Sequence, residues 1–259
     1  MRLRSRNAIT ASCEDACHTV AMLRPRSDAR QWVVAERYAI EPWVPATEYV
    51  DCFGNLCQRF TLPKGESRII VEHEVEVADQ MAVDRRAAQV PPDALPDSAL
   101  LYMLQSRYCP SDMMSERAAR IVEGCPPGYA QAERIADWIR DNIEYRYGVS
   151  KASTGALDTL RHGAGVCRDF AHVGVALCRS LLLPARLVAG YLHGLEPMDM
   201  HAWYEVFLGG QWYGFDPTQE QPRGGRIVVA HGRDAADVAF LSNYGPMELT
   251  DMDVSVWPA

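Results

Sequence analysis

The sequence contains no apolar run that approaches the roughly 20 residues of a membrane-spanning helix. It also lacks an excess of basic residues, since 26 Lys and Arg residues stand against 34 Asp and Glu residues and give a net charge of −8. Proteins that bind nucleic acid present a basic face. We therefore expect neither a membrane nor a nucleic-acid partner, while the sequence leaves the oligomeric state open.

The first residues lack the continuous apolar segment of a secretory signal. Residues 1–6 are basic, but residues 7–17 include Glu14 and Asp15 and form no apolar core. A cytoplasmic location is the default expectation, and in that compartment the eight cysteines predict free thiols.

The cysteine spacings also lack the form of common zinc motifs. Cys13 and Cys17 are separated by three residues, and Cys52 and Cys57 by four, which does not match the short zinc knuckles. We expect no metal and no cofactor, and a zinc-stabilised protein is a minor alternative.

What the chain does contain predicts a globular α+β protein. It has 259 residues, of which 48% are hydrophobic and 23% charged, enough for one large domain or two ordinary ones. Residues 1–90 hold strand-like segments at 31–40, 49–60 and 68–77, separated by turns, and predict an antiparallel β-sandwich in which His73 lies at the surface. A Pro-rich linker at about 90–97 then separates this N-terminal domain from a second domain that runs from 91 to 259.

The second domain opens with helical patterns at 112–123 and 130–143. A third pattern follows the glycines of 163–165: Val166, Phe170, Val173, Leu177 and Leu181 recur on one helical face, and a proline at 184 stops the helix. The spacing places a cysteine, residue 167, in the first turn of a buried helix.

Cys167 is a candidate nucleophile because of that position. A helix N-terminus offers unpaired N–H groups and partial positive charge, which favour the thiolate and can bind an oxyanion. Gly165 would allow a substrate backbone to approach closely. The alternative is a small, inert core cysteine, an interpretation that suits Cys178 in the same helix.

A predicted β-hairpin supplies a candidate base and its orienting acid. Strands at 185–192, 201–208 and 211–217 are expected, with Gly209 and Gly210 as a two-residue turn between the last two. Counting from the turn, residue 203 faces residue 216, so His201 and Asp216 share a sheet face one diagonal step apart. A carboxylate in that place can fix the tautomer and direction of the imidazole.

Each of these residues has a plainer interpretation. A strand histidine is often structural, and an Asp-Pro pair is a common turn starter. His162, His172 and His193 are rival bases, and His231 is a weaker one. His172 lies within the nucleophile helix, where a packing role is expected.

Three blocks, in this order, together resemble the bacterial transglutaminase-like superfamily. They are 165–172 (Gly-Val-Cys-Arg-Asp-Phe-Ala-His), 201–206 (His-Ala-Trp-Tyr-Glu-Val) and 212–218 (Trp-Tyr-Gly-Phe-Asp-Pro-Thr). Segments 145–148, 154–160 and 231–238 extend the likeness. The Asp-Cys-Phe-Gly-Asn turn at 51–55 resembles the β-type N-terminal region often attached to that family.

The resemblance implies a papain-like catalytic domain in which a helix carrying Cys167 packs on an antiparallel sheet. It implies that Cys167 is the nucleophile, His201 the base and Asp216 the residue that orients the base. The Cys167 backbone N–H would be one oxyanion donor. The second is an upstream polar or aromatic side chain, for which Tyr147 is a candidate, with a packing role as the alternative.

The function expected from this resemblance is attack on an amide carbonyl through a cysteine thioester, with a peptide or protein as substrate. Water as acceptor gives a peptidase or amidase, and an amine gives glutamine acyl transfer. We favour hydrolysis, because transfer needs a site that excludes water. A non-catalytic interaction module on the same fold is the competing hypothesis.

Overall fold

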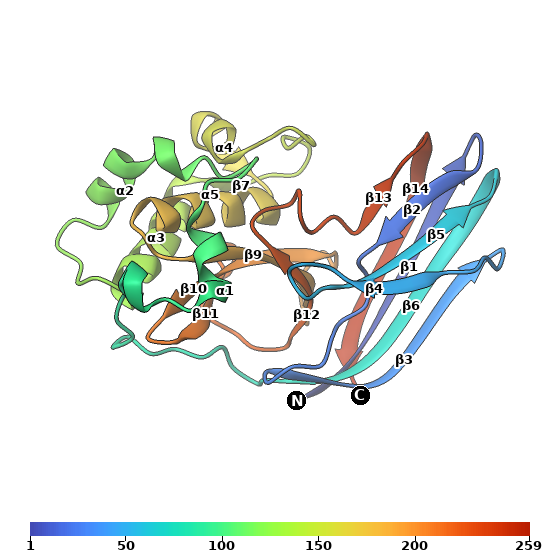
Figure 1. Cartoon of the computed structure of the whole chain (residues 1–259), viewed down its shortest axis with the longest axis horizontal. Helices are drawn as coiled ribbons and strands as arrows, with labels where there is room; N and C mark the ends of the chain where they lie inside the picture. The colour runs from blue at the N-terminus through green and yellow to red at the C-terminus, as the bar shows by residue number, and fades with distance from the viewer.

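The computed structural model describes residues 1–259 as two lobes, one made of strands and one in which helices pack on a sheet (Figure 1). The β lobe contains β1 (Arg2–Cys13), β2 (Cys17–Ala21), β3 (Gln31–Glu41), β4 (Thr47–Val50), β5 (Leu56–Leu62), β6 (Gly65–Val77), β13 (Leu241–Asn243) and β14 (Met247–Pro258). No helix of the structure combines the length and the hydropathy needed to cross a bilayer.

The α+β lobe holds the remaining elements. Its short helical segments are η1 (Pro92–Ala94), α1 (Asp97–Leu100), η2 (Leu101–Met103), η3 (Ser111–Met113), α2 (Ser115–Ile121) and α4 (Ala156–His162). Its long helices are α3 (Tyr129–Asn142) and α5 (Cys167–Ser180). Its strands are β7 (Glu144–Tyr145), β8 (Ala164–Gly165), β9 (Ala185–Leu192), β10 (His201–Leu208), β11 (Gln211–Phe215) and β12 (Arg226–Gly232).

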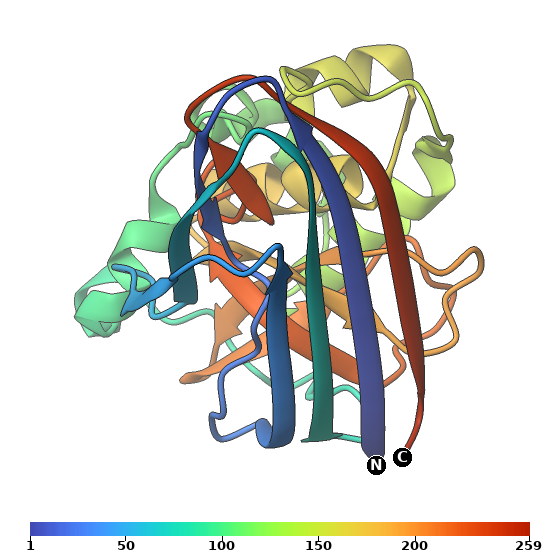
Figure 2. The ribbon, with the colours of Figure 1, turned by 90° about the vertical axis from the view of Figure 1, so that its right-hand side faces the viewer.

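Two antiparallel sheets form the β lobe, in the strand orders β14-β1-β6-β3 and β13-β2-β5-β4. Figure 2 shows the four long strands of the first sheet side by side. Ile9 and Val71 from the first sheet share one core with Phe60 and Leu62 from the second. The two sheets share this core because alternate residues of each strand point inward.

His73 is buried, so the prediction of a surface histidine is wrong. It is 3% exposed and its Nδ1 lies 3.2 Å from Ser5 Oγ on the neighbouring strand. The strand alternation explains this, because His73 shares a face with Val71 and Val75, which are both fully buried.

The C-terminal residues return to the β lobe. β14 pairs along β1 from Pro258 to Met247, and β13 pairs with β2. The structure therefore differs from the predicted division into 1–90 and 91–259, because 241–258 complete the N-terminal sheets. Strand alternation is a local signal that does not say which sheet a strand joins, which is why the sequence placed these residues with the second domain.

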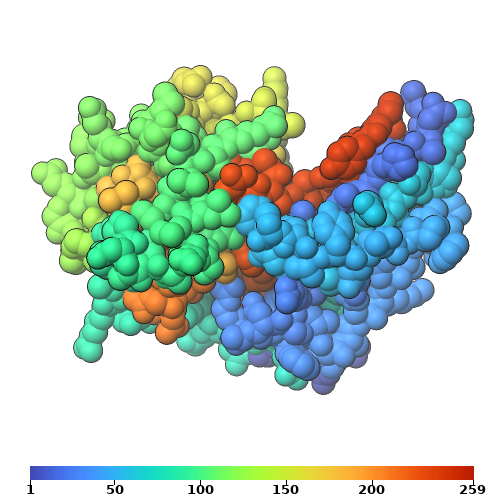
Figure 3. All heavy atoms as spheres, viewed as in Figure 1, coloured from blue at the N-terminus to red at the C-terminus, as the bar shows by residue number.

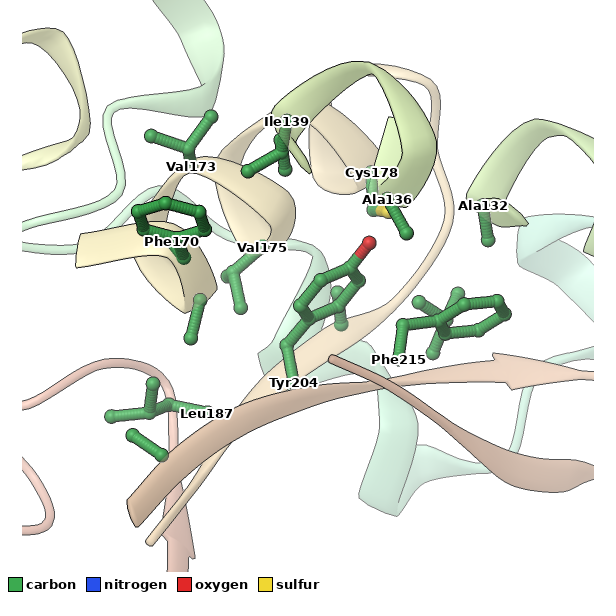
Figure 4. Packing of buried hydrophobic residues seen from close by; sticks show 14 of the residues in the cluster. Ala132, Ala136, Ile139, Phe170, Val173, Val175, Cys178, Leu187, Tyr204 and Phe215 are labelled. Atoms are coloured by element: carbon green, nitrogen blue, oxygen red, sulfur yellow. The ribbon is translucent and has the colours of Figure 1, made fainter. Parts of the chain in front are cut away.

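The α+β lobe is built on a four-stranded antiparallel sheet in the order β11-β10-β9-β12. Helix α5 packs on it, and α3 packs on α5. Figure 4 shows Tyr204 of β10 pointing from the sheet toward Cys178 of α5 and Ala136 of α3, with Phe215 of β11 at its side. The predicted helices at 112–123 and 130–143 correspond to α2 and α3. The predicted helix that begins at Cys167 is α5, and the predicted strands at 185–192, 201–208 and 211–217 are β9, β10 and β11.

The free edge of this sheet is covered by two side-chain amides from the β lobe. Gln31 donates from Nε2 to the Val228 carbonyl and accepts the Val228 N–H at Oε1, both at 2.8 Å. Asn55 forms the same pair of bonds with the N–H and carbonyl of His231, both at 2.9 Å. We call these two side chains the amide clamp. They occupy backbone groups that an exposed edge strand would leave open.

The Asp-x-x-Gly-Asn turn holds one half of the amide clamp in place. Asp51 accepts the backbone N–H of Asn55 at 2.8 Å and its Nδ2 at 2.9 Å. Gly54 completes the turn with a φ of +86°, a backbone region that favours glycine. This motif therefore helps to join the two lobes, which are in broad contact in Figure 3.

Replacing Asn55 with alanine tests the amide clamp. Asn55 is 3% exposed, so its loss leaves the N–H and carbonyl of His231 buried without partners. We expect the free energy of unfolding, measured with urea, to fall by about 2–4 kcal/mol. The exposed amide Gln105 provides the matched control, and Gln105→Ala should change stability by less than about 0.5 kcal/mol. Equal stability of the two variants would contradict the clamp.

Candidate active site

Helix α5 begins at Cys167, as the sequence predicts. The Asp169 carboxylate accepts the N–H of Val166 at 3.0 Å and closes the first turn. Asp169 is fully buried and also accepts the Ser150 hydroxyl at 3.0 Å. Cys167 therefore stands at the start of a helix that a buried carboxylate caps, and its side chain remains partly exposed.

Gly165 has a different role from the one expected. A Cβ at this position would lie 2.7 Å from the Asp169 Cβ and 3.2 Å from a methyl carbon of Thr159. Glycine is required here so that α4 and the start of α5 can approach each other. The space that was predicted to admit a substrate backbone is filled by these two side chains.

The hairpin of β10 and β11, which carries His201 and leads into Asp216, has the predicted register. Leu208 pairs with Gln211 and Tyr204 with Phe215, and Gly209 and Gly210 both have positive φ as a tight hairpin turn requires. The structure brings His201 and Asp216 into direct contact, with 2.7 Å between His201 Nε2 and Asp216 Oδ2. Both side chains are almost completely buried.

Cys167 is a further group that acts on the His201 imidazole. Nε2 is engaged by Asp216, and the buried Nδ1 makes no hydrogen bond of ordinary geometry. Cys167 is nevertheless close enough to the His201 ring to raise the pKa of the imidazole. A loose contact between nucleophile and base is common without substrate, because such bonds tighten when the substrate is bound.

The charges of the site favour a protonated imidazole. Burial alone would lower the pKa of His201, but the Asp216 carboxylate and the contact with Cys167 raise it to about 9. Burial would raise the pKa of Asp216, but the charges of Arg226 and His201 hold it well below its ordinary value. The pair can therefore hold a proton between the thiol and the carboxylate near neutral pH.

Two further residues bind the Asp216 carboxylate. Thr218 donates to Oδ1 from its hydroxyl at 2.7 Å and from its backbone N–H at 3.1 Å. Arg226 donates from Nη2 to Oδ2 at 2.8 Å. Thr218 lies in a block that the sequence singled out, but Arg226 carries no motif signal and was missed.

Tyr145, rather than Tyr147, is the tyrosine beside Cys167. Its ring lies 5.8 Å from that of Phe170 between centroids, and its hydroxyl interacts with the backbone of Cys167. Burial, Cys167 and Tyr147 together hold the pKa of Tyr145 well above its usual range, so the phenol keeps its proton. Tyr147 packs edge-on against Tyr145 and is 53% exposed. Both tyrosines follow α3 two residues apart, so sequence spacing could not separate them.

The rival histidines lie away from this cluster. His172 is buried beneath Tyr108, with 5.1 Å between ring centroids, and its Nε2 accepts the Ala235 N–H at 3.2 Å. Burial lowers the pKa values of His172 and His231 to about 4. His162 is exposed at the end of α4, and His193 lies in the loop after β9. None of the four contacts Asp216.

Comparison with known proteins places the chain in a family. The transglutaminase-like superfamily matches residues 115–217, and the bacterial transglutaminase-like N-terminal region matches residues 14–78. The chain is 31% identical over 265 residues to an uncharacterized protein of Mycobacterium tuberculosis, covering 90% of this chain and 84% of that one. An uncharacterized protein of Mycobacterium leprae is 29% identical over 252 residues, covering 91% and 89%.

A solved structure extends the likeness to the whole chain. A crystal structure from Cytophaga hutchinsonii, described as a "Putative Cysteine Protease", superposes with a TM-score of 0.93 at 31% identity, covering 99% of this chain and 90% of that one. The fold and sequence define a transglutaminase-like core with its bacterial N-terminal region. The chain belongs to the transglutaminase-like superfamily.

The reactivity of Cys167 can be tested against an internal standard. Cys52 is an exposed cysteine outside the site, and Cys178 is fully buried. Because a histidine held by a carboxylate lies near Cys167 at a helix N-terminus, we expect iodoacetamide to label Cys167 on the order of 10-fold faster than Cys52 near neutral pH. Peptide mapping by mass spectrometry gives both rates in one sample. His201→Gln should remove the difference and leave labelling of Cys52 unchanged, whereas equal rates in the unmodified protein would deny an activated thiol.

Proposed function

We propose that this chain is a cysteine hydrolase that cleaves amide bonds of peptides or proteins through a thioester on Cys167. The observation that carries the proposal is the buried 2.7 Å contact between His201 and Asp216 beside the cysteine at the start of α5. A base held by an acid next to a thiol at a helix N-terminus is the arrangement that nucleophilic catalysis requires.

The reaction follows from these positions. The Cys167 thiolate attacks the amide carbonyl carbon, and the carbonyl π electrons move to the oxygen. When the tetrahedral intermediate collapses, the C–N bond breaks and the His201 imidazolium gives its proton to the leaving amine. Water then attacks the thioester carbonyl while His201 takes its proton. When this second tetrahedral intermediate collapses, the C–S bond breaks, which releases a carboxylic acid and restores the Cys167 thiolate beside the His201 imidazolium.

Tyr145 is proposed as the second oxyanion donor. Its protonated hydroxyl interacts with the backbone of Cys167, whose N–H is the first donor. A substrate carbonyl that replaces this contact would meet both groups at once. Donors fixed in advance stabilise the developing oxyanion most effectively, because no reorganisation is needed during the reaction.

Hydrolysis is favoured over transfer because the nucleophile is accessible to solvent. Cys167 is partly exposed, and Tyr145 and Tyr147 beside it are 41% and 53% exposed. Transfer to an amine competes with water only where water is kept out. The exposure of Cys167 and of both tyrosines therefore favours water as the acceptor.

The acceptor can be identified with a glutamine-containing peptide and a biotin-labelled primary amine. We expect mass spectrometry to find the free acid as the main product and little amine conjugate, with both absent in Cys167→Ala. If the amine conjugate exceeds the free acid, the reaction is acyl transfer and the proposal of hydrolysis is wrong. A library of peptide amides that forms no adduct on Cys167 would favour the non-catalytic interaction module.

The tyrosine pair allows a matched test of the oxyanion donor. Tyr145→Phe removes one hydroxyl next to Cys167, and we expect kcat to fall on the order of 10²-fold with little change in KM. Tyr147→Phe removes the neighbouring exposed hydroxyl and should leave kcat within about twofold. A larger effect of Tyr147→Phe would restore Tyr147 as the donor that the sequence suggested.

A further inference from the structure

Arg226 and His201 share one oxygen of Asp216. Arg226 Nη2 donates to Oδ2 at 2.8 Å, and His201 Nε2 bonds the same atom at 2.7 Å. The other oxygen, Oδ1, is taken up by the two donors of Thr218. Each carboxylate oxygen therefore accepts two hydrogen bonds, and both cationic groups bind the same oxygen, Oδ2.

The arginine is held in place from three sides. Its side chain is 7% exposed, and its Nε donates to the Arg223 carbonyl at 3.1 Å. The guanidinium carbon lies 5.0 Å from the centroid of the Trp203 ring. Two residues further along β12, Val228 is bound by Gln31 of the amide clamp. An arginine fixed in this way presents a constant charge to Asp216.

The consequence concerns the proton on His201. A buried carboxylate with His201 as its only counter-charge would hold the imidazolium proton strongly. A second cation on the same oxygen weakens that hold, and it also repels the imidazolium directly. The groups that face His201 are Asp216 after β11, Cys167 on α5 and, through Asp216, Arg226 on β12.

We propose that Arg226 is a positioning residue that fixes Asp216 for His201 and limits how tightly the pair retains the imidazolium proton, so that the leaving amine can receive it. This inference rests on the proposed function. Arg226 lies outside residues 115–217, the segment that matches the transglutaminase-like superfamily, and the inference gives it a part in the proton transfer. It also gives the amide clamp a catalytic consequence, because the clamp holds the strand that carries Arg226.

The test measures the titration of His201 rather than activity. Nuclear magnetic resonance of the histidine rings, with His201→Gln to assign the signal, gives the upper apparent pKa of the Cys167–His201 pair. In Arg226→Ala we expect this value to rise by about one unit or more, since a nearby cation is removed. Arg226→Lys keeps the charge and should stay near the unmodified protein. Thr218→Val removes an uncharged donor from the same carboxylate and should produce a smaller shift.

Chemical rescue separates the charge from a general effect on folding. Arg226 borders a cavity of about 400 Å³ that is also lined by Trp203, Trp212 and Gly214, so a small cation can reach the vacated position. Guanidinium chloride at tens of millimolar should return the titration of Arg226→Ala toward the original value, and sodium chloride at the same concentration should not. Arg226→Gln, which retains a neutral donor, replaces Arg226→Ala if the alanine variant does not fold.

The outcomes are distinct from those that test the proposed function. An unchanged His201 titration in a folded Arg226→Ala or Arg226→Gln protein overturns the role of Arg226, even if Cys167 is reactive. A shift of equal size in Arg226→Lys also overturns it, because charge would then be irrelevant. Slow labelling of Cys167 in the unmodified protein instead refutes the catalytic function itself.

Discussion

The buried carboxylate of Asp216 is the group on which the site depends. Removing an ionised carboxylate from water costs several kcal/mol unless charged and hydrogen-bonding partners replace the solvent. Here two cations and two donors from Thr218 do so, at 2.7–3.1 Å. His201 is consequently held in one orientation by a partner that cannot leave its place. The thiol of Cys167 therefore meets a ring whose position is already fixed, which reduces the reorganisation needed when substrate arrives.

The β lobe supports this arrangement across the contact between the lobes. Edge strand β12 brings Arg226 to the carboxylate, and Gln31 and Asn55 bind that strand through backbone groups that would otherwise be open. The core shared by the two lobes includes Leu3 and Val256 of the β lobe together with Tyr191 of β9. The N-terminal region is thus packed as a structural part of the α+β lobe rather than as an attached module, and the solved relative matches the two lobes together over nearly the whole chain.

The sequence was most informative where a signal is local. The start of α5 followed from the glycines before Cys167, and the register of β10 and β11 followed from the turn at Gly209 and Gly210, so the contact of His201 with Asp216 could be anticipated. Signals that depend on long-range pairing were not accessible. Arg226 reaches Asp216 only because β12 pairs with β9, and residues 241–258 join the β lobe through pairing with β1 and β2.

The choice between water and an amine as acceptor depends on features that the buried pair does not control. In the proposed mechanism, His201 and Asp216 would serve the first half-reaction in the same way for a hydrolase and a transferase, because both form the same thioester. The second half-reaction depends on what surrounds Cys167, where Tyr145 and Tyr147 stand open to solvent. Under the proposed function, water at bulk concentration would compete for a thioester at this partly exposed position, and an amine would need a binding site of its own. The exposed surface beside Cys167, more than the buried pair, is therefore what favours the proposed hydrolysis over transfer.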